Sequence, residues 1–300
     1  MNPLYHADDF GITPEQSRLI LGYSSLCGGC GALNSLSILV NSPQFKTCAD
    51  ILEPFLGKIH VCLHVNIVEG HCCADPQTIP LLVNEQGMFA QDFAHLLFMS
   101  LGQRHKELKQ QIKLEISAQF DRYLRRFPQM RNALRVDSHQ HFHLIPLVFD
   151  ALNEVIREQD CSVEYIRIPA EPVVPFLQTP SVWMKIPPIN WIKHWLLNFL
   201  WRFDKTKALA RKNYSAVFCG INLSGHMTPD RVMPLIPHLQ AYAKRHEMEL
   251  ELLFHPGGLD NEDSALNPTL TDFVAFYMSP YRAQEGHTLQ RLVDDNHCNE

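Results

Sequence analysis

The chain has 300 residues, 46% of them hydrophobic, and a formal net charge of −6 at pH 7. This composition excludes a disordered chain and supports a sizeable core, and the length suits one large α/β domain or two small ones. The acidic balance argues against a nucleic-acid-binding protein, which normally carries a basic face, and it favours a small or neutral substrate.

The first residues, MNPLYHADDFG, lack the basic start and apolar stretch of a signal peptide, so we expect a cytoplasmic protein with reduced cysteines. A helix is expected after Thr13, with Thr13 as its N-cap, Pro14 as its first residue and Gln16 as the capping-box partner. Strands that alternate with helices indicate βαβ units and a mainly parallel sheet. The helical patterns lie at 104–126, 145–158 and 228–246, and the apolar runs that predict strands lie at 33–40, 58–67, 133–139, 163–169, 214–221 and 248–255.

Two of the expected strands have one apolar and one polar face. In residues 58–66 the odd positions are apolar and the even positions are polar or Cys, and in 249–255 the even positions are apolar. A strand with an apolar outer face and a polar inner face that ends in histidine suits the interior of a barrel that opens at its C-terminal rim. We therefore expect an α/β fold, an irregular (β/α) barrel similar to a TIM barrel, rather than a doubly wound sheet.

Four short motifs stand at the carboxyl ends of expected strands: HADDFG (6–11), HVNIVEG (64–70), DSHQHFH (137–143) and LLFHPGG (252–258). Because a parallel sheet gathers these ends together, the four motifs can converge on one site. Their carboxylates and imidazoles, without a thiolate, suit a divalent cation such as Zn, Mn, Co or Mg. The sequence therefore predicts a metal site.

Each motif also has a structural interpretation. Asp8 and Asp9 could cap the following helix, His64 alone could be a buried core histidine, and His255 could simply end a strand. If DSHQHFH continues as a strand, it places four polar side chains on one face: Asp137, His139, His141 and His143. Such a row is costly to bury without partners, and two of its histidines could orient a ligand instead of binding the metal.

Residues 170–212 form an insert that a simple barrel lacks. It is rich in proline and continues into an apolar helix candidate whose run from Trp191 to Phe203 is apolar nearly all round. This helix could be a buried barrel helix, a contact in a homodimer, or a lip that touches a membrane surface or a lipid tail. We expect a barrel domain over 1–263 that includes the insert, and a helical C-terminal tail, 264–300, packed on the same domain.

Five segments, in this order, resemble the YdjC-like carbohydrate deacetylase family, which includes chito-oligosaccharide deacetylases: ADDFG, HVNIVEG, DSHQHFH, IRIPAE (166–171) and ELLFHPGG (251–258). The resemblance implies a (β/α)-barrel-like fold and metal-dependent removal of N-acetyl groups from amino sugars, with Mg as the usual metal. His6 is a departure, since Asn is commoner there. The insert and SGHMT (224–228) resemble the branch associated with hopanoid biosynthesis, which implies an amino sugar on a lipid.

Carried onto this chain, the resemblance implies Asp9, His64 and His139 as metal ligands, Asp8 as the catalytic base and His255 as the candidate acid. Arg167 could keep Asp8 ionised, meet a sugar hydroxyl or form a plain surface salt bridge. The residues expected to bind substrate or to orient the ligands are Asp137, His141, His143, Asn66, Arg167 and Glu251.

We therefore expect a metal-dependent carbohydrate N-deacetylase that acts on a chito-oligosaccharide or a glycolipid head group. Two alternatives remain. A metal-dependent phosphoesterase would use similar ligands but needs a basic clamp or a second metal. A non-catalytic sugar- or lipid-binding protein would keep the fold but would have no use for Asp8 beside a metal. The expected partners are the N-acetylated sugar or its glycolipid, with peripheral membrane contact through 191–203 and a homodimer as further options.

Overall fold

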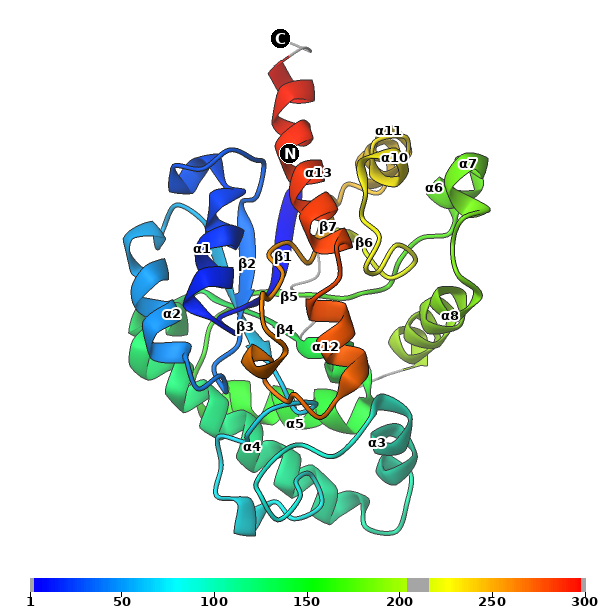
Figure 1. Ribbon diagram of the computed structural model, residues 1–300. Coiled ribbons are helices and arrows are strands. Elements are labelled where there is room, and N and C mark those ends of the chain that lie inside the picture. Colours follow the sequence, from blue (N-terminus) through cyan, green and yellow to red (C-terminus); the bar gives the residue numbers. More distant parts are fainter. Residues whose placement is uncertain (1–2, 204–215, 298–300) are drawn as a thin grey trace.

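The computed structural model describes residues 3–203 and 216–297 (Figure 1). The part of the expected insert at 204–212 and the last three residues of the tail lie outside the described residues. Seven strands form one sheet in the order β5-β4-β3-β2-β1-β7-β6, and all neighbours are parallel. The strands are β1 Leu4–Phe10, β2 Ser35–Ile38, β3 His60–Val65, β4 Leu134–Ser138, β5 Val163–Ile166, β6 Ala216–Cys219 and β7 Glu249–Phe254.

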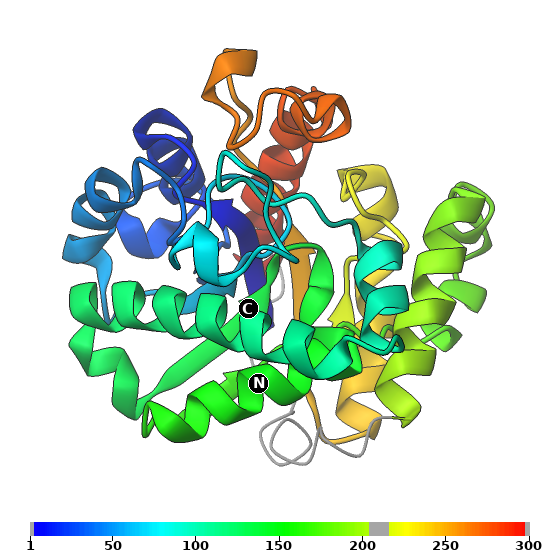
Figure 2. The ribbon, with the colours of Figure 1, turned by 90° about the horizontal axis from the view of Figure 1, so that it is seen from below.

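The sheet curls into a partial barrel that helices surround (Figure 2). Tyr165 on β5 donates a hydrogen bond to Glu251 on β7, although five strand spacings separate the two strands in the sheet order. A flat sheet would hold them about 24 Å apart at roughly 4.8 Å per strand, so this contact requires strong curvature. The expected α/β fold is confirmed.

The edge strands β5 and β6 do not pair with each other in the described part of the chain, so the barrel is open at this seam. Just beyond the strand ends, the seam is bridged by a side chain. The carboxylate of Glu171, which follows β5, accepts hydrogen bonds from the backbone N–H groups of Gly220 at 2.7 Å and Asn222 at 2.9 Å, which follow β6. A buried carboxylate thus joins the two edges where strand pairing ends.

The helices surround the sheet, and apolar side chains of the strands form the core with those on its outer face, while Val274 and Tyr277 belong to a second apolar cluster beyond the strand ends. They are α1 Pro14–Gly22, α2 Phe45–Leu52, α3 Phe93–Ser100, α4 His105–Arg126, α5 Pro146–Glu158, α6 Val174–Leu177, α7 Pro180–Trp183, α8 Pro188–Phe203, α10 Pro229–Val232, α11 Ile236–Arg245, α12 Thr271–Tyr277 and α13 Tyr281–His297. The short 3-10 helices are η1 Ser25–Cys27, η2 Glu53–Phe55, η3 Pro76–Thr78, η4 Pro128–Asn132, η5 His139–Leu144 and η7 Glu262–Ser264. Among the described residues, none of these helices has the length and apolar character needed to cross a bilayer.

Helix α1 begins as the sequence predicts, with one exception. The Thr13 hydroxyl accepts a hydrogen bond from the backbone N–H of Gln16 at 3.1 Å, and Pro14 is the first helical residue. The prediction that the Gln16 side chain completes a capping box was wrong. Gln16 is buried, and its amide donates instead to the carbonyl oxygen of Asp9 at 3.0 Å. This bond ties the helix to the end of β1.

Candidate metal centre and active site

Three side chains from separate motifs meet above the carboxyl ends of β1, β3 and β4. The Oδ1 atom of Asp9 lies 3.8 Å from Nε2 of His64 and 3.1 Å from Nδ1 of His139. Asp9 adopts a positive φ of 64°, which turns the chain sharply at the end of β1. One potential ligand atom from each residue lies within 4.8 Å of the other two, and all three residues are buried. The fold therefore brings one carboxylate and two imidazoles to a single point.

The atoms at this point fit a divalent cation. Oδ1 of Asp9 and Nε2 of His64 are buried, and neither makes a hydrogen bond of acceptable geometry within the described residues. His139 turns its Nδ1 toward Oδ1 of Asp9, while its Nε2 faces Glu69. Buried polar atoms without partners are costly, so such atoms usually have a ligand. Carboxylate oxygen and imidazole nitrogen bind Zn at about 2.0–2.2 Å and also suit other divalent metals. The donor set leaves coordination positions for water and substrate.

A hydrogen-bond chain through the barrel interior orients His64. Its Nδ1 lies 2.6 Å from Oδ1 of Asp137, the residue opposite His64 on β4. An ionised carboxylate only accepts hydrogen bonds, so Nδ1 carries the proton and Nε2 keeps a bare lone pair toward the cation site. Burial opposes ionisation of Asp137, but Arg167 and His64 lower its pKa to about 2. Carboxylate–histidine pairs of this kind orient the imidazole at many metal sites, so the arrangement fits the expectation for His64.

The chain continues to His6, which sequence reasoning assigned no role. The Ser37 hydroxyl donates to Asp137, so the Ser37 oxygen is left to accept from Nε2 of His6 at 2.7 Å. Nδ1 of His6 then accepts from the Ser35 hydroxyl, also at 2.7 Å. Ser37 of β2 thus connects Asp137 to His6 of β1. The serines lie in the predicted strand 33–40, and no motif marked them.

Asp8 is held by a buried arginine. Nη1 of Arg167 lies 2.8 and 3.0 Å from the two carboxylate oxygens of Asp8 and 2.9 Å from Oδ2 of Asp137, and its Nε donates to Glu251 at 2.7 Å. Burial would raise the pKa of Asp8, but the charges of Arg167 and His64 hold it well below its usual range. Arg167 is fully buried, so the interpretation as a surface salt bridge was wrong. Glu251 faces inward and anchors the guanidinium.

The stretch DSHQHFH does not continue as a strand. Strand β4 ends at Ser138, and His139 begins the 3-10 helix η5. Gln140 and His141 have φ values of 49° and 61°, so the backbone turns and the alternation of side chains is lost. The prediction that His139, His141 and His143 share one strand face was therefore wrong. Each of the three histidines has a different environment.

His139 reaches the cation site, whereas the other two do not. His143 packs beneath the turn, with its Nδ1 2.6 Å from the Ser138 hydroxyl and its Nε2 2.8 Å from the carbonyl oxygen of Arg167. It fixes the shape of η5. His141 is partly exposed and contacts the ring of Phe218 edge-on, and burial lowers its pKa well below the usual value. Of the two, His141 is the residue available to a substrate.

Glu69 is a further acidic neighbour that sequence reasoning missed, although it lies within the quoted motif HVNIVEG. Its Oε1 lies 3.1 Å from Nε2 of His139 and accepts a hydrogen bond from the Tyr277 hydroxyl. Burial lowers the pKa of His139, but the carboxylates of Asp9 and Glu69 outweigh it and raise the pKa to about 10. A cation between Asp9 and His139 would take the place of this proton.

Asn66 organises the loop that follows β3. Its side-chain amide donates to Asn41 at 3.1 Å and to the carbonyl of Glu69 at 2.9 Å, and its oxygen accepts from the backbone of Val68 and Glu69. These bonds use the hydrogen-bonding capacity of the side chain. Asn66 thus sets the turn that points Glu69 at His139, and its expected role in binding substrate or orienting ligands stays a prediction.

His255 follows β7, and the C-terminal helices surround it. Its backbone N–H donates to Glu285 on α13, and its ring contacts Phe276 on α12 edge-on. Burial, helped by the charges of Arg282 and His139, lowers the pKa of His255 to about 4. The imidazole is therefore neutral at neutral pH.

Residues 264–297 supply several contacts to the site, although no sequence motif in this segment predicted them. Arg282 donates to Oδ2 of Asp9 at 2.7 Å, Tyr277 bonds to Glu69, and the Phe273 ring lies 5.6 Å from the ring of His139. Burial raises the pKa of Glu285 to about 7, although it accepts backbone hydrogen bonds from His255 and Met227. In the sequence these residues have no characteristic spacing, so no signal could have found them.

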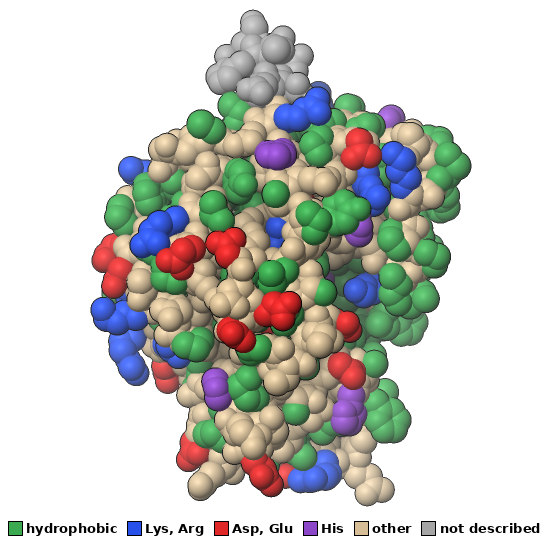
Figure 3. All heavy atoms as spheres, viewed as in Figure 1, with side chains coloured by type: hydrophobic (Ala, Val, Ile, Leu, Met, Phe, Trp, Pro, Cys, Tyr) green, Lys and Arg blue, Asp and Glu red, His purple; other side chains and the backbone are tan. Residues whose placement is uncertain are grey.

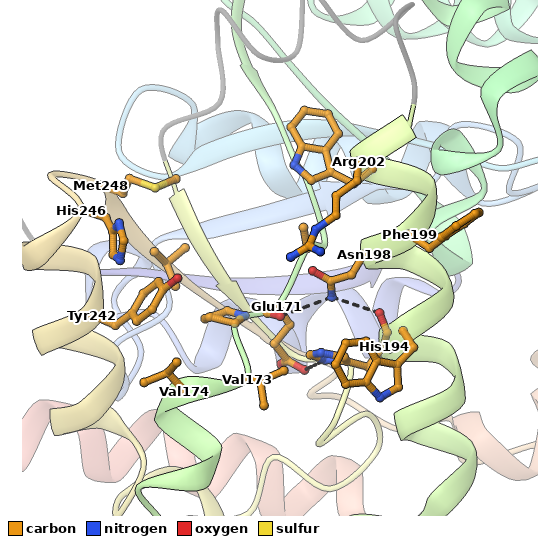
Figure 4. Close-up of a pocket in the computed structure, with 15 residues that line it drawn as sticks. Glu171, Val173, Val174, His194, Asn198, Phe199, Arg202, Tyr242, His246 and Met248 are labelled. Atoms are coloured by element: carbon orange, nitrogen blue, oxygen red, sulfur yellow. Dashed lines mark hydrogen bonds and ion pairs between the residues drawn. The ribbon is translucent and has the colours of Figure 1, made fainter.

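A cavity of about 750 Å³ lies away from these groups, on the outer wall between α8 and α11 near the open seam (Figure 4). Its lining includes Trp195, Trp201 and Arg202 of α8. Figure 4 shows Arg202 on α8 across the cavity from Tyr242 of α11 and from His246, which follows α11. It holds none of the candidate ligands. The cavity is therefore separate from the candidate active site, which lies where the side chains of Asp9, His64 and His139 converge.

Comparisons with known proteins agree with this geometry. A family model described as YdjC-like protein matches residues 4–293. A carbohydrate deacetylase of Danio rerio is 27% identical over 169 residues, which cover 56% of this chain and 50% of that protein. A chitooligosaccharide deacetylase of Escherichia fergusonii is 21% identical over 297 residues, which cover 97% of this chain and 98% of that protein. The match thus spans about half the length of the Danio rerio relative and nearly all of the bacterial one.

A solved structure shares the fold. The crystal structure of a protein from Enterococcus faecalis V583, whose description names cellobiose-phosphate cleavage, superposes with a TM-score of 0.60 at 15% sequence identity. The superposition covers 99% of this chain and 93% of that protein. At this identity, the likeness supports the architecture alone.

Proposed function

Because the chain belongs to the YdjC-like protein family, we propose that it is a metal-dependent hydrolase that removes the N-acetyl group from an N-acetylated amino sugar. One observation carries the proposal: Asp9, His64 and His139 bring buried potential ligand atoms together beside an Asp8 carboxylate that stays ionised. Amide hydrolysis needs a group that accepts a proton from the attacking water, and a carboxylate beside a cation site can do this. The names of the relatives support the sugar amide as the target.

In this mechanism, Asp9, His64 and His139 would hold the cation, and Asp137 and Arg282 would orient two of these ligands. A bound divalent cation supplies Lewis acidity, which polarises the acetyl carbonyl and makes water acidic enough to lose a proton near neutral pH. Mg is the metal we propose, and Zn, Mn and Co suit the same donors.

Asp8 is the proposed base. Its Oδ2 lies 3.9 Å from Nε2 of His64, which places the carboxylate at the edge of the cation site. Arg167 fixes both carboxylate oxygens and keeps the group ionised, so Asp8 can accept the proton of the attacking water without first losing one. Glu251 in turn accepts a hydrogen bond from Nε of the guanidinium, and the Tyr165 hydroxyl donates to Glu251. The base is therefore positioned before a substrate arrives.

His255 is the proposed acid for the leaving nitrogen. Hydrolysis breaks the C–N bond, and the amine leaves only when its nitrogen gains a proton. Because the pKa of His255 is lowered to about 4, its imidazole starts neutral and must take up a proton after the substrate binds. A cationic His255 would lie near the carboxylates of Asp8 and Asp9, whose charges favour the protonated form. His141, partly exposed at the rim, is the proposed substrate contact.

We also propose that the C-terminal helices belong to the same functional unit as the barrel, since Tyr277, Arg282 and Glu285 bond to residues of the site. The phosphoesterase alternative is weaker, because both arginines buried here, Arg167 and Arg282, already bond to carboxylates. A basic clamp for a phosphate would need cations that are not engaged in this way.

The decisive experiment measures acetate release from chitobiose, free N-acetylglucosamine and an N-acetylated amino sugar on a lipid, with and without chelator. We expect release of acetate from at least one compound, and we expect the chelator to abolish this release.

Asp8→Asn should lower turnover by about 10²–10⁴-fold while metal content stays at the wild-type level. The matched control is Asp121→Asn, on the exposed surface of α4. A non-catalytic binding protein would release no acetate and would keep its sugar affinity in Asp8→Asn.

A further inference from the structure

Helices α6, α7 and α8 expose a row of large apolar side chains, which we call the α6–α8 face. Figure 3 shows hydrophobic side chains along the right-hand edge of the molecule, over the elements that Figure 1 labels α6, α7 and α8. Ile192 and Trp195 are 63% and 59% exposed, and Met184 is 78% exposed. Contiguous apolar surface of this kind on a protein marks an interaction site. The members of the face are Val174, Leu177, Trp183, Met184, Ile189, Ile192 and Trp195.

Hydrogen bonds on the inner side of α8 fix the rotation of the helix about its axis, so this face points outward. The side chain of Asn190 donates to the carbonyl of Asn222 at 3.0 Å. Nδ1 of His194 lies 3.2 Å from the amide of Asn222 and 3.4 Å from Glu171. These residues are buried, whereas Ile189, Ile192 and Trp195 lie on the other side of the helix. Rotating α8 to bury the apolar row would break these bonds, so the row stays outward.

The charges around the face are basic. Between residues 172 and 202 the charged side chains are Lys185, Lys193 and Arg202, all exposed, with no Asp or Glu, although the chain as a whole has a net charge of −6. Lys185 pairs with Asp230 at 3.2 Å. A second copy packed across a two-fold axis would bring this basic face against its own like charges. An anionic surface complements it instead.

We propose that the α6–α8 face is a docking surface for the anionic surface of a lipid bilayer. Aliphatic and tryptophan side chains enter the boundary between head groups and acyl chains, while Lys193 meets the anionic head groups. The protein then lies on the bilayer without crossing it.

The docking surface adjoins the candidate active site. Helix α8 contacts η5, the segment that carries His139. Phe142 of η5 also packs edge-on against Phe93 of α3, with ring centroids 5.1 Å apart. Helix α3 lies beside α8 in both ribbon views and ends at exposed Phe98 and Leu101 (Figures 1 and 2). Docking would therefore hold the protein with η5 close to the lipid surface.

The test uses the full chain and sedimentation with vesicles of phosphatidylcholine alone or with 30% phosphatidylglycerol. We expect binding to the anionic vesicles, weaker binding to neutral ones, and loss of binding at high salt. Ile189→Ser/Ile192→Ser should weaken binding at least about tenfold, and Lys193→Glu at least about fivefold. The matched control, Leu19→Ser/Leu26→Ser, changes two exposed leucines of α1 and η1, outside the face, and should bind like the wild type.

Circular dichroism and thermal unfolding check that each variant is folded. The proposal is overturned if the wild type binds neither kind of vesicle, or if the control loses binding as strongly as the Ile189→Ser/Ile192→Ser variant. It is also overturned if sedimentation velocity shows a wild-type dimer that the same double variant dissociates, because the face would then bind a second copy. None of these measurements depends on hydrolytic activity, so the outcome is separate from that of the acetate assay.

Discussion

Arg282 donates a hydrogen bond to Oδ2 of Asp9 at 2.7 Å across 273 positions of the chain. The guanidinium also reaches the carbonyl oxygens of Gly257 and Phe276 and stacks near the ring of Tyr277. Because one oxygen of Asp9 is held by Arg282, the other faces His64 and His139. A residue from the last helix thus sets the orientation of a proposed metal ligand on the first strand.

Replacing Arg282 by Gln should weaken metal binding. Loss of a group that orients a ligand typically costs about 10–100-fold in metal affinity, and we expect a loss in that range for Arg282→Gln. Isothermal titration with Mg and Zn measures it, and Arg282→Lys should recover part of the affinity because it keeps the charge. Arg291→Gln, an exposed position on the same helix, is the control. Wild-type affinity in Arg282→Gln would show that Asp9 needs no such support.

Replacing His255 by Gln should separate catalysis from metal binding. If His255 protonates the leaving nitrogen, His255→Gln lowers kcat by about 10²–10⁴-fold and leaves the metal content unchanged. The exposed His287→Gln on α13 is the control. Steady-state acetate release and metal analysis of the purified variants give both readings. Equal loss of metal and activity would instead make His255 part of the cation site.

The strand-end motifs were enough to predict where the site lies. Parallel strands collect their carboxyl ends, so the positions of HADDFG, HVNIVEG and DSHQHFH in the chain predicted that Asp9, His64 and His139 converge, and the structure places a ligand atom of each within 4.8 Å of the others. Their roles as ligands stay a prediction. The succession of expected strands and helices likewise predicted the α/β class, and the apolar–polar alternation within two strands favoured a barrel-like sheet, because it records which face is buried.

Other features of the site depend on contacts between distant parts of the chain, and the local sequence does not indicate them. The positive φ values of Gln140 and His141 end the alternation of DSHQHFH, and neither residue is Gly, so no residue type marked the turn. Gln16 bonds to the carbonyl of Asp9 instead of completing a capping box, because burial leaves its amide only that partner. Arg282 lies in an ordinary amphipathic stretch, and only the packing of α13 onto the barrel gives it its role.

Replacing Ser37 by Ala should test the interior hydrogen-bond chain. The Ser37 hydroxyl joins His6 to Asp137, so its loss leaves Nε2 of His6 without its acceptor and removes one donor from a buried carboxylate. We expect the free energy of unfolding to fall by about 1–3 kcal/mol, measured by urea denaturation without metal. Ser25→Ala, at an exposed position, should change stability by less than about 0.5 kcal/mol. An unchanged stability in Ser37→Ala would mean that the chain contributes nothing.

Glu285 should make stability depend on pH. Its pKa is raised by burial from 4.5 to about 7 in the folded protein, so the folded state binds more protons than the unfolded state between these values. The stabilising contribution is complete below pH 4.5 and is lost as pH rises through 7. Relative to Glu285→Gln, the wild type should therefore lose roughly 2 kcal/mol of unfolding free energy between pH 5 and pH 8. Urea denaturation at both pH values measures the difference. Glu85→Gln, an exposed control, should show none, and a pH-independent difference for Glu285→Gln would contradict the raised pKa.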